Sequence, residues 1–155
     1  MQADNIQKVA LGWREWVALP DLGLHAIKTK IDTGAKTSAL HAYYTEPYQL
    51  DGVDMVKFLI HPIQKNSDCH VECHAPISDY REITDSGGHK EMRYVIESNI
   101  VVGSQQWSIE LTLTNRDTMR FRMLLGRRAM QNRVIVNPDA SFLHGKLKAR
   151  KLYRL

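Results

Sequence analysis

The sequence predicts an all-β fold, a small barrel or sandwich formed by one domain spanning residues 1–155. Three observations lead to this prediction. Short segments that alternate apolar and polar residues recur with turn residues about every 8–12 positions, a spacing typical of all-β domains. One short stretch near the C-terminal part, residues 127–132, has a helical pattern. There is no heptad pattern and no repeat of solenoid length.

The predicted elements follow one another in a simple order. A hairpin is expected around Gly103-Ser104, because the strand after it alternates cleanly from Trp107 to Thr114. Residues 78–90 are polar and contain Gly87-Gly88, which fits either a flap or a surface loop. The core is expected at about residues 8–143, followed by a basic tail at 144–155. The predicted strands cover residues 8–19, 25–31, 38–44, 53–61, 69–75, 93–102, 106–114, 122–125 and 133–136.

One of these strands ends in a motif that is typical of catalytic acids. Residues 25–31 lead directly into Asp32-Thr33-Gly34-Ala35. A glycine lets the backbone turn sharply after the acid, and the amides of such a turn can point at the carboxylate. A short motif of this kind is also an ordinary turn sequence, since Asp and Gly are common turn formers. Its position after a strand favours the interpretation that Asp32 is a catalytic acid.

Further motifs support this interpretation. Downstream, Met123-Leu124-Leu125-Gly126-Arg127 supplies an apolar pair, a glycine and an arginine before the short helical stretch. Together with Gly12-Trp13-Arg14-Glu15 and residues 113–117, these motifs resemble a bacterial retropepsin-like group labelled ATP-dependent zinc protease, which includes RimB-like proteins. The resemblance spans about residues 12–143. It implies a small closed barrel in which the downstream strand packs against the active-site turn.

The same resemblance implies a reaction. An aspartic peptidase needs two adjacent carboxylates that share one proton, so that one activates water and the other donates to the scissile carbonyl. The resemblance suggests a homodimer that meets on a two-fold axis, where each copy contributes Asp32, Thr33, Gly34 and Ala35. Asp85-Ser86-Gly87 repeats the pattern but lacks an apolar strand before it, which favours a plain turn. Asp117 is a further candidate, but it lies in a predicted loop.

Basic residues point to the class of substrate. Lys36 and Thr37 occupy positions where retroviral relatives often carry acids, so Arg127 must find another acid or face the substrate. Arginines match carboxylates in geometry, and a cluster of them can also be a solvated surface. The resemblance also favours a functional role for Ser86, Gly88, Glu91 and Arg93, whose segment fits a flap or a surface loop equally well. The predicted substrate-binding residues are Lys36, Thr37, Ser86, Gly88, Glu91, Arg93, Arg116, Arg127 and Arg128.

No metal or cofactor is expected. Cys69 and Cys73 have a spacing that zinc sites allow, but no second pair of ligands follows, so reduced structural cysteines are the preferred interpretation. No glycine-rich phosphate loop is present, which argues against use of ATP by this chain. No apolar run reaches membrane-spanning length, and residues 1–8 lack a signal-peptide core. We therefore expect a cytoplasmic protein without a membrane partner.

The net charge of +4 and a pI of about 9.1 suggest acidic partners, with acidic peptide favoured over nucleic acid. The prediction is an aspartic peptidase acting on glutamate-rich or glutamate-modified peptide or protein, with a functional link to an ATP-grasp glutamate ligase implied by the resemblance. The alternative is a non-catalytic monomeric barrel that binds acidic peptide or RNA. The basic tail fits nucleic-acid binding or, more simply, solubility.

Overall fold

The computed structural model describes residues 7–85, 87–115 and 120–155, and their dominant structure is β-strand. The strands are β1 (Val9–Leu11), β2 (Arg14–Leu19), β3 (Leu24–Asp32), β4 (Ser38–His41), β5 (Tyr44–Leu50), β6 (Val53–Ile60), β7 (Val71–Pro76), β8 (Asp79–Thr84), β9 (Lys90–Val102), β10 (Gln105–Thr114), β11 (Met123–Gly126) and β12 (Val134–Val136). The short helices are η2 (Pro20–Leu22), α1 (Arg127–Met130) and α2 (Ala149–Leu152).

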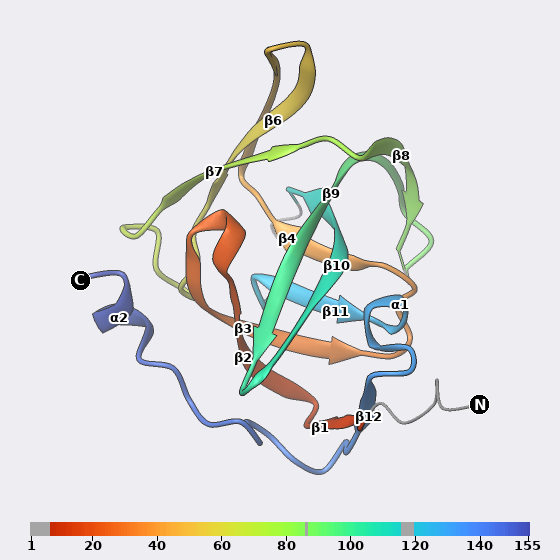
Figure 1. Cartoon of the computed structure of the whole chain (residues 1–155), viewed down its shortest axis with the longest axis vertical. Coiled ribbons are helices and arrows are strands. Elements are labelled where there is room, and N and C mark those ends of the chain that lie inside the picture. Colours follow the sequence, from red (N-terminus) through yellow and green to blue (C-terminus); the bar gives the residue numbers. More distant parts are fainter. Residues whose placement is uncertain (1–6, 86, 116–119) are drawn as a thin grey trace.

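Six strands close into a barrel. Their order is β10-β4-β11-β3-β2-β9, and β9 also pairs with β10, so the ring has no open edge (Figure 1). Strand β8 extends β9 outside the ring as the second half of a hairpin. β11 lies between β3 and β4 and runs parallel to β3. The predicted all-β barrel is confirmed, and so is the expectation that the downstream strand packs beside the Asp32 strand.

The barrel interior follows the alternation of the sequence. Leu111 and Leu113 of β10 are buried, as predicted for one face of that strand. Thr112 and Thr114, on the polar side of the alternation, are buried as well. The reason is that this end of β10 is covered by polar groups: Thr112 Oγ1 donates to the carbonyl of Ser38 at 2.9 Å. The inner face of β10 is therefore apolar, while its other face lies against a buried polar cluster.

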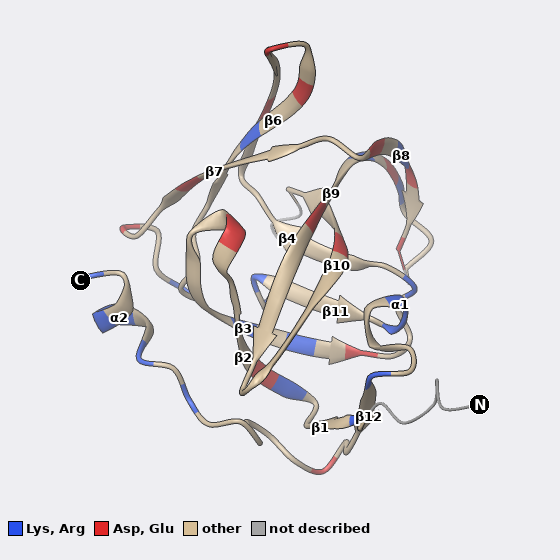
Figure 2. Cartoon of the chain, viewed as in Figure 1, with Lys and Arg blue, Asp and Glu red and all other residues tan. Residues whose placement is uncertain are grey.

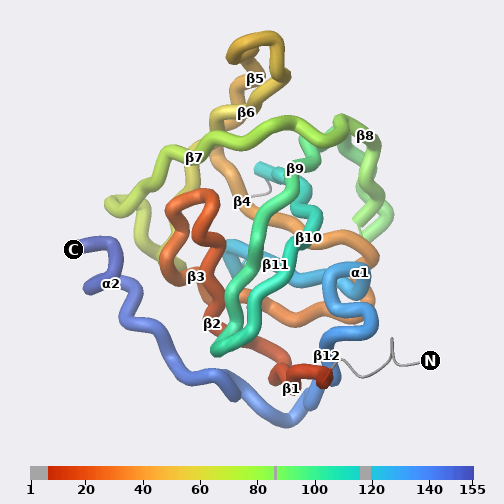
Figure 3. The backbone as a smooth tube through the Cα atoms, viewed as in Figure 1, coloured from red at the N-terminus to blue at the C-terminus, as the bar shows by residue number. Residues whose placement is uncertain are grey.

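A separate three-stranded sheet, β5-β6-β7, stands beside the barrel (Figure 3). Val56, Phe58 and Ile60 of β6 are fully buried, which confirms the predicted apolar face. The predicted strand at 38–44 is wrong in extent, because β4 ends at His41 and the chain continues into β5. Residues 44–50 are mostly exposed, so they carry no alternating pattern from which the sequence could identify a strand.

The C-terminal segment runs back along the barrel. Glu15 is fully buried, and its carboxylate accepts amide hydrogen bonds from Gly12 at 2.7 Å and Leu143 at 3.0 Å. The Tyr153 hydroxyl, beyond the unpredicted helix α2, donates to the carbonyl of Ala26 at 2.8 Å. These contacts fasten the segment to β2 and β3. Among the described residues, no helix has the length and apolar character needed to cross a membrane.

Candidate active site

The strand pairing places Asp32 at the end of β3, where the barrel opens. Asp32 is the last residue of β3 and stands opposite Gly126 in the parallel pairing with β11. Its side chain is half-buried. Residues of opposite parity on β3, such as Thr29 and Ile31, point into the core. The alternation therefore directs Asp32 to the outer face, toward a cavity.

A compact turn holds the carboxylate. The amide of Gly34 donates to Asp32 Oδ1 at 2.9 Å, and the amide of Ala35 donates to the carbonyl of Asp32 at 3.2 Å. Such amide donors favour an ionised carboxylate. The second carboxylate oxygen of Asp32 has no hydrogen-bond partner among the residues that the structure describes. One oxygen is thus fixed by the turn, and the other remains available to the cavity.

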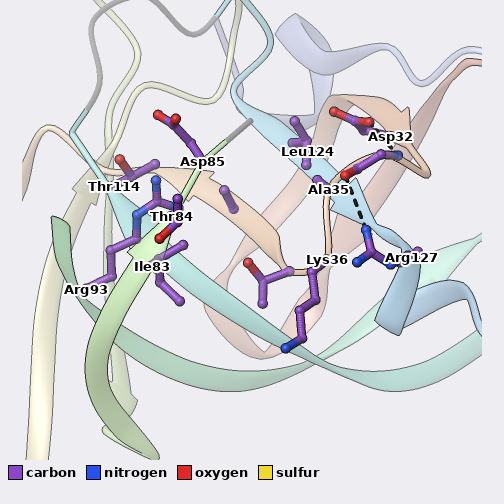
Figure 4. A pocket seen from close by; sticks show the side chains of 13 residues that line it. Asp32, Ala35, Lys36, Ile83, Thr84, Asp85, Arg93, Thr114, Leu124 and Arg127 are labelled. Atoms are coloured by element: carbon purple, nitrogen blue, oxygen red, sulfur yellow. Dashed lines mark hydrogen bonds between the residues drawn. The ribbon is translucent and has the colours of Figure 1, made fainter. Parts of the chain in front are cut away.

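The first residues of α1 hold this turn through backbone hydrogen bonds. The amide of Arg127 donates to the carbonyl of Ala35 at 2.8 Å, and the amide of Arg128 to that of Lys36 at 3.2 Å. Arg127 Nη1 also donates to the carbonyl of Gly34 at 3.2 Å (Figure 4). Within the described part of the chain, Arg127 has no acidic partner. It binds the backbone of the turn and also lines the cavity.

Gly126 is required where β11 passes the turn. A Cβ atom at this position would stand 2.6 Å from the carbonyl carbon of Thr37 and 3.0 Å from the carbonyl oxygen of Ala35. Both are backbone atoms, so a side chain would displace the turn itself. The amide of Gly126 donates to Ser38 Oγ at 3.0 Å. The glycine and arginine of this motif thus allow β11 and α1 to pack closely against the Asp32 turn.

The cavity beside Asp32 has a volume of about 390 Å³. Asp32 and Arg127 lie at one end, and Arg93 and Asp85 at the other (Figure 4). The remaining lining residues are Gly34, Ala35, Lys36, Thr37, Ala39, Ile83, Thr84, Thr114 and Leu124. The cavity therefore lies between the Asp32 turn, β10, β11 and the β8–β9 hairpin.

A buried polar cluster forms one wall of this cavity. The Arg93 side chain is 6% exposed, and its Nε donates to Glu91 Oε1 at 2.5 Å. Arg93 Nη1 donates to Thr112 Oγ1 at 3.1 Å, while Thr114 Oγ1 donates to the same Glu91 oxygen at 2.5 Å. A buried guanidinium needs a paired charge and further acceptors, which Glu91 and Thr112 supply. The wall thus presents a fixed cation to the cavity.

The predicted site residues are only partly brought together. Lys36, Thr37, Arg93 and Arg127 line the Asp32 cavity, and Glu91 acts behind Arg93. Arg128 lies at a different cavity, beside Trp107. Thr33 is exposed and does not line the Asp32 cavity, and Gly88 lies in the β8–β9 connection with a φ of 83°. Ser86, Arg116 and Asp117 lie outside the described residues.

Asp85 is an acidic residue of the cavity that was not predicted to lie there. The predicted plain turn is present: Asp85 Oδ1 accepts the amides of Gly87 and His89, both at 2.9 Å. The β8–β9 hairpin nevertheless brings this turn to the edge of the Asp32 cavity. Sequence gave little indication of this, because β8 was not recognised as a strand. The available sequence signal was the Gly87-Gly88 pair, which is typical of a short hairpin connection.

The cysteines contribute no chemistry to this cavity. Both thiols are free and buried, and Cys73 Sγ donates to the carbonyl of Leu22 at 3.3 Å. Burial raises the pKa of Cys73 to about 12 and raises the pKa of Cys69 as well. Both thiols therefore remain protonated near neutral pH. His70, Glu72 and His74 are exposed on the opposite side of this segment.

Comparison with known proteins places this geometry in context. Two similar curated proteins are named probable alpha-L-glutamate ligase: one from Shewanella pealeana, 45% identical over 97% of this chain, and one from Parasynechococcus marenigrum, 44% identical over 94%. The chain spans only 33% and 31% of their lengths. A crystal structure of a Legionella pneumophila protein of unknown function matches 89% of this chain and 99% of its own, with a TM-score of 0.73 and 24% identity.

The structural match concerns the fold, because its sequence identity is low. The family assignment comes from sequence. The description "Retropepsin-like aspartic endopeptidase RimB" belongs to a family profile that matches residues 10–147, which include β2 through β12 and the Asp32 turn. This chain therefore belongs to the RimB-like family of retropepsin-like aspartic endopeptidases.

Proposed function

We propose that this protein is an aspartic peptidase in which Asp32 activates water, with two copies each contributing one Asp32. The observation that carries the proposal is the state of the Asp32 carboxylate. One oxygen is bound by the Gly34 amide, and the other faces a cavity of about 390 Å³ large enough for a peptide segment. The turn is anchored by β11 and α1, so the carboxylate is held in place before substrate arrives.

The proposed reaction uses a pair of carboxylates. Two Asp32 side chains at contact distance share one proton, because like charges so close cannot both ionise. The ionised partner takes a proton from water, which attacks the scissile carbonyl carbon. The protonated partner donates to the carbonyl oxygen, and collapse of the tetrahedral intermediate releases the amine. The exposed Thr33 stands next to Asp32 and is available for contact with the second copy.

We further propose that the substrate is rich in glutamate or carries added glutamates. Lys36, Arg93 and Arg127 line the cavity, and Arg93 is held rigidly by Glu91 and Thr112. Guanidinium groups in fixed positions suit carboxylates. The similar proteins named glutamate ligase contain a region like this chain within a polypeptide about three times as long. A functional link with such a ligase fits a peptidase that removes what a ligase adds.

The decisive experiment compares wild type with Asp32→Ala on a poly-glutamylated peptide, with product formation followed by mass spectrometry. Wild type should release glutamate-containing fragments, and Asp32→Ala should not. Sedimentation at the assay concentration should find a dimer. Equal cleavage by both proteins would contradict the role of Asp32. A monomer that binds the peptide without cleaving it would favour the alternative of a binding module.

Removal of metal provides a separate check. EDTA should leave the rate of cleavage and the melting temperature unchanged, because the proposed chemistry uses carboxylates and water alone. Within the described residues, no group of three or more His, Cys, Asp and Glu side chains is arranged to hold a metal ion. A melting temperature that falls with EDTA and recovers with zinc would contradict this part of the proposal.

A further inference from the structure

A second cavity lies on the outer face of β2 and β3. Its residues take no part in the proposed reaction. Its volume is about 400 Å³, comparable to that of the Asp32 cavity. We call it the basic groove and define it by Trp13, Arg14, Trp16, Lys28, Arg120 and Phe121. It contains the Trp13-Arg14 pair of a sequence motif for which the Asp32 chemistry has no use.

The basic groove gathers positive charge, and the described residues supply no counter-charge to it. Burial lowers the pKa of Lys28, and the neighbouring charges of Arg14, Lys146 and Arg120 lower it further. Among the residues that the structure describes, none of those lining the groove is acidic. Within the described ranges, no carboxylate oxygen lies within 4.0 Å of these four cations. Cations gathered in this way repel one another, and an anion bound among them would relieve the repulsion.

The aromatic rings of the groove support the cations. The Arg14 guanidinium lies 4.6 Å from the ring centre of Trp13, and Phe121 meets Trp13 edge-on at 6.1 Å. Lys28 Nζ lies 5.5 Å from the ring centre of Trp16. Such cation–π contacts hold charged groups in place. The guanidinium and ammonium groups held in this way give the groove a set of positioned N–H donors.

The basic groove and the Asp32 cavity share one face of the barrel. Lys28, Lys30 and Asp32 alternate along β3 and therefore project to the same side. Across the strands, Lys30 stands opposite Arg14 of the groove on one side and opposite Leu124 of the Asp32 cavity on the other. Figure 2 shows Lys and Arg on β2 and β3 just before the acidic end of β3. Lys30 thus connects the two sites.

The distance between the groove and Asp32 suits an extended peptide. Asp32 lies four residue steps after Lys28 on the strand, which is about 13 Å at the usual strand rise. An extended peptide of about four residues covers the same distance. We propose that the basic groove is an exosite that binds carboxylates of an extended acidic peptide whose scissile bond lies at Asp32. The proposal rests on the proposed function, because it assigns that substrate a path across the molecule.

A direct binding measurement tests the exosite without relying on turnover. Fluorescein-labelled oligoglutamate is titrated with protein carrying Asp32→Asn, and anisotropy gives Kd. Adding Lys28→Gln and Arg120→Gln should raise Kd about fivefold or more, since each exposed charge contact contributes up to about 1 kcal/mol. The matched control is Lys8→Gln with Lys57→Gln, which removes the same charge elsewhere and should leave Kd unchanged. Arg120→Gln alone provides a variant at an exposed position.

The outcomes separate the exosite from the proposed function. In the wild-type background, the Lys28→Gln and Arg120→Gln pair should raise KM for oligoglutamate while leaving kcat unchanged. Cleavage by wild type together with equal Kd values for both double variants would overturn the exosite and leave the peptidase intact. If the groove variant loses binding and wild type cleaves nothing, the basic groove would be supported as a peptide-binding site. The proposed peptidase activity would be contradicted. Tighter, groove-dependent binding of oligouridine RNA would overturn the peptide as occupant.

Discussion

Two turns of this molecule share a sequence pattern and a hydrogen bond but differ in their surroundings. In Asp32-Thr33-Gly34 and Asp85-Ser86-Gly87, the glycine amide donates to the Oδ1 atom of the acid at 2.9 Å in both cases. Both acids line the same cavity (Figure 4). The local pattern therefore determines the local bond. It does not determine which acid is equipped for catalysis.

The difference comes from distant parts of the chain. The Asp32 turn ends a barrel strand and is bonded to the residues that follow β11. The Asp85 turn connects β8 and β9, and its Oδ1 atom also accepts the His89 amide and lies 3.4 Å from His89 Nδ1. Asp85 is thus engaged by its own hairpin. Asp32 receives one amide and keeps an oxygen for the cavity.

Neutralising each acid should produce the largest contrast. We expect Asp32→Asn to lower kcat by about 10²–10⁴-fold, the usual contribution of a general acid–base group. Asp85→Asn keeps an acceptor oxygen for the turn and should lower kcat by less than about tenfold. Steady-state kinetics on one acidic peptide measures both, with circular dichroism as a check of folding. A comparable loss in the two variants would make Asp85 part of the catalytic machinery.

The fold was predictable where the pattern was simple. Alternation in β6 and β10 and the turn at Gly103 predicted buried strands and a hairpin correctly. β5 was not predictable, because its residues are largely exposed and do not alternate. Helix α2 was hidden in a basic tail, and it is held by the Tyr153 contact to Ala26, which joins residues 127 positions apart. Such long-range contacts leave no local signal.

The site was predictable to a similar degree. Strand followed by acid and glycine identified the Asp32 turn, and the family resemblance supplied its packing against β11. The contact between Arg127 and the carbonyl of Gly34 was not among the two expected roles of this arginine. The cluster of Glu91, Arg93 and Thr112 was also hidden, since it joins two strands through side chains buried on a face that appeared polar. Both depend on tertiary geometry.

Enlarging a glycine at each turn tests how firmly the turns are anchored. Gly126→Ala places Cβ within 2.6–3.0 Å of backbone atoms of Thr37 and Ala35, and should destabilise the fold by about 1–3 kcal/mol. Gly87→Ala meets mainly the His89 side chain at 3.1 Å, which can move, so the cost should be below about 1 kcal/mol. Urea denaturation measures both. Equal costs would mean that the two turns are equally constrained.

Removing the side-chain anchors should have smaller effects. Arg127→Leu deletes the hydrogen bond to the carbonyl of Gly34, an exposed contact that should contribute about 0.5–1.5 kcal/mol. We expect kcat to fall more than stability, because the Asp32 turn loses support while the barrel remains. His89→Leu removes the contact to Asp85 and should change kcat little. If kcat is unaffected by Arg127→Leu, the backbone bonds of the turn are sufficient.

Charge beside the two turns provides the finest comparison. Lys36 follows the Asp32 turn and lines the cavity, whereas Lys90 follows the Asp85 turn, is exposed and does not line it. Exposed charge pairs contribute about 0.2–1 kcal/mol, so Lys36→Glu should lower kcat/KM for acidic peptides about two- to tenfold. Neutral peptides should be affected less, and Lys90→Glu should change neither. Salt screens exposed charges beyond about 10 Å at 0.1 M, so the wild-type preference for acidic peptides should weaken as salt rises.

This result would locate selectivity independently of catalysis. If Lys36→Glu impairs only acidic substrates and Asp32→Asn impairs all of them, recognition and water activation reside in neighbouring residues of one turn. If wild type cuts neutral and acidic peptides equally at every salt concentration, the glutamate preference fails. The role of Asp32 would survive that outcome, because it depends on the anchored turn and the free carboxylate oxygen. The contrast between the turns would then lie in geometry alone, with charge contributing nothing to their difference.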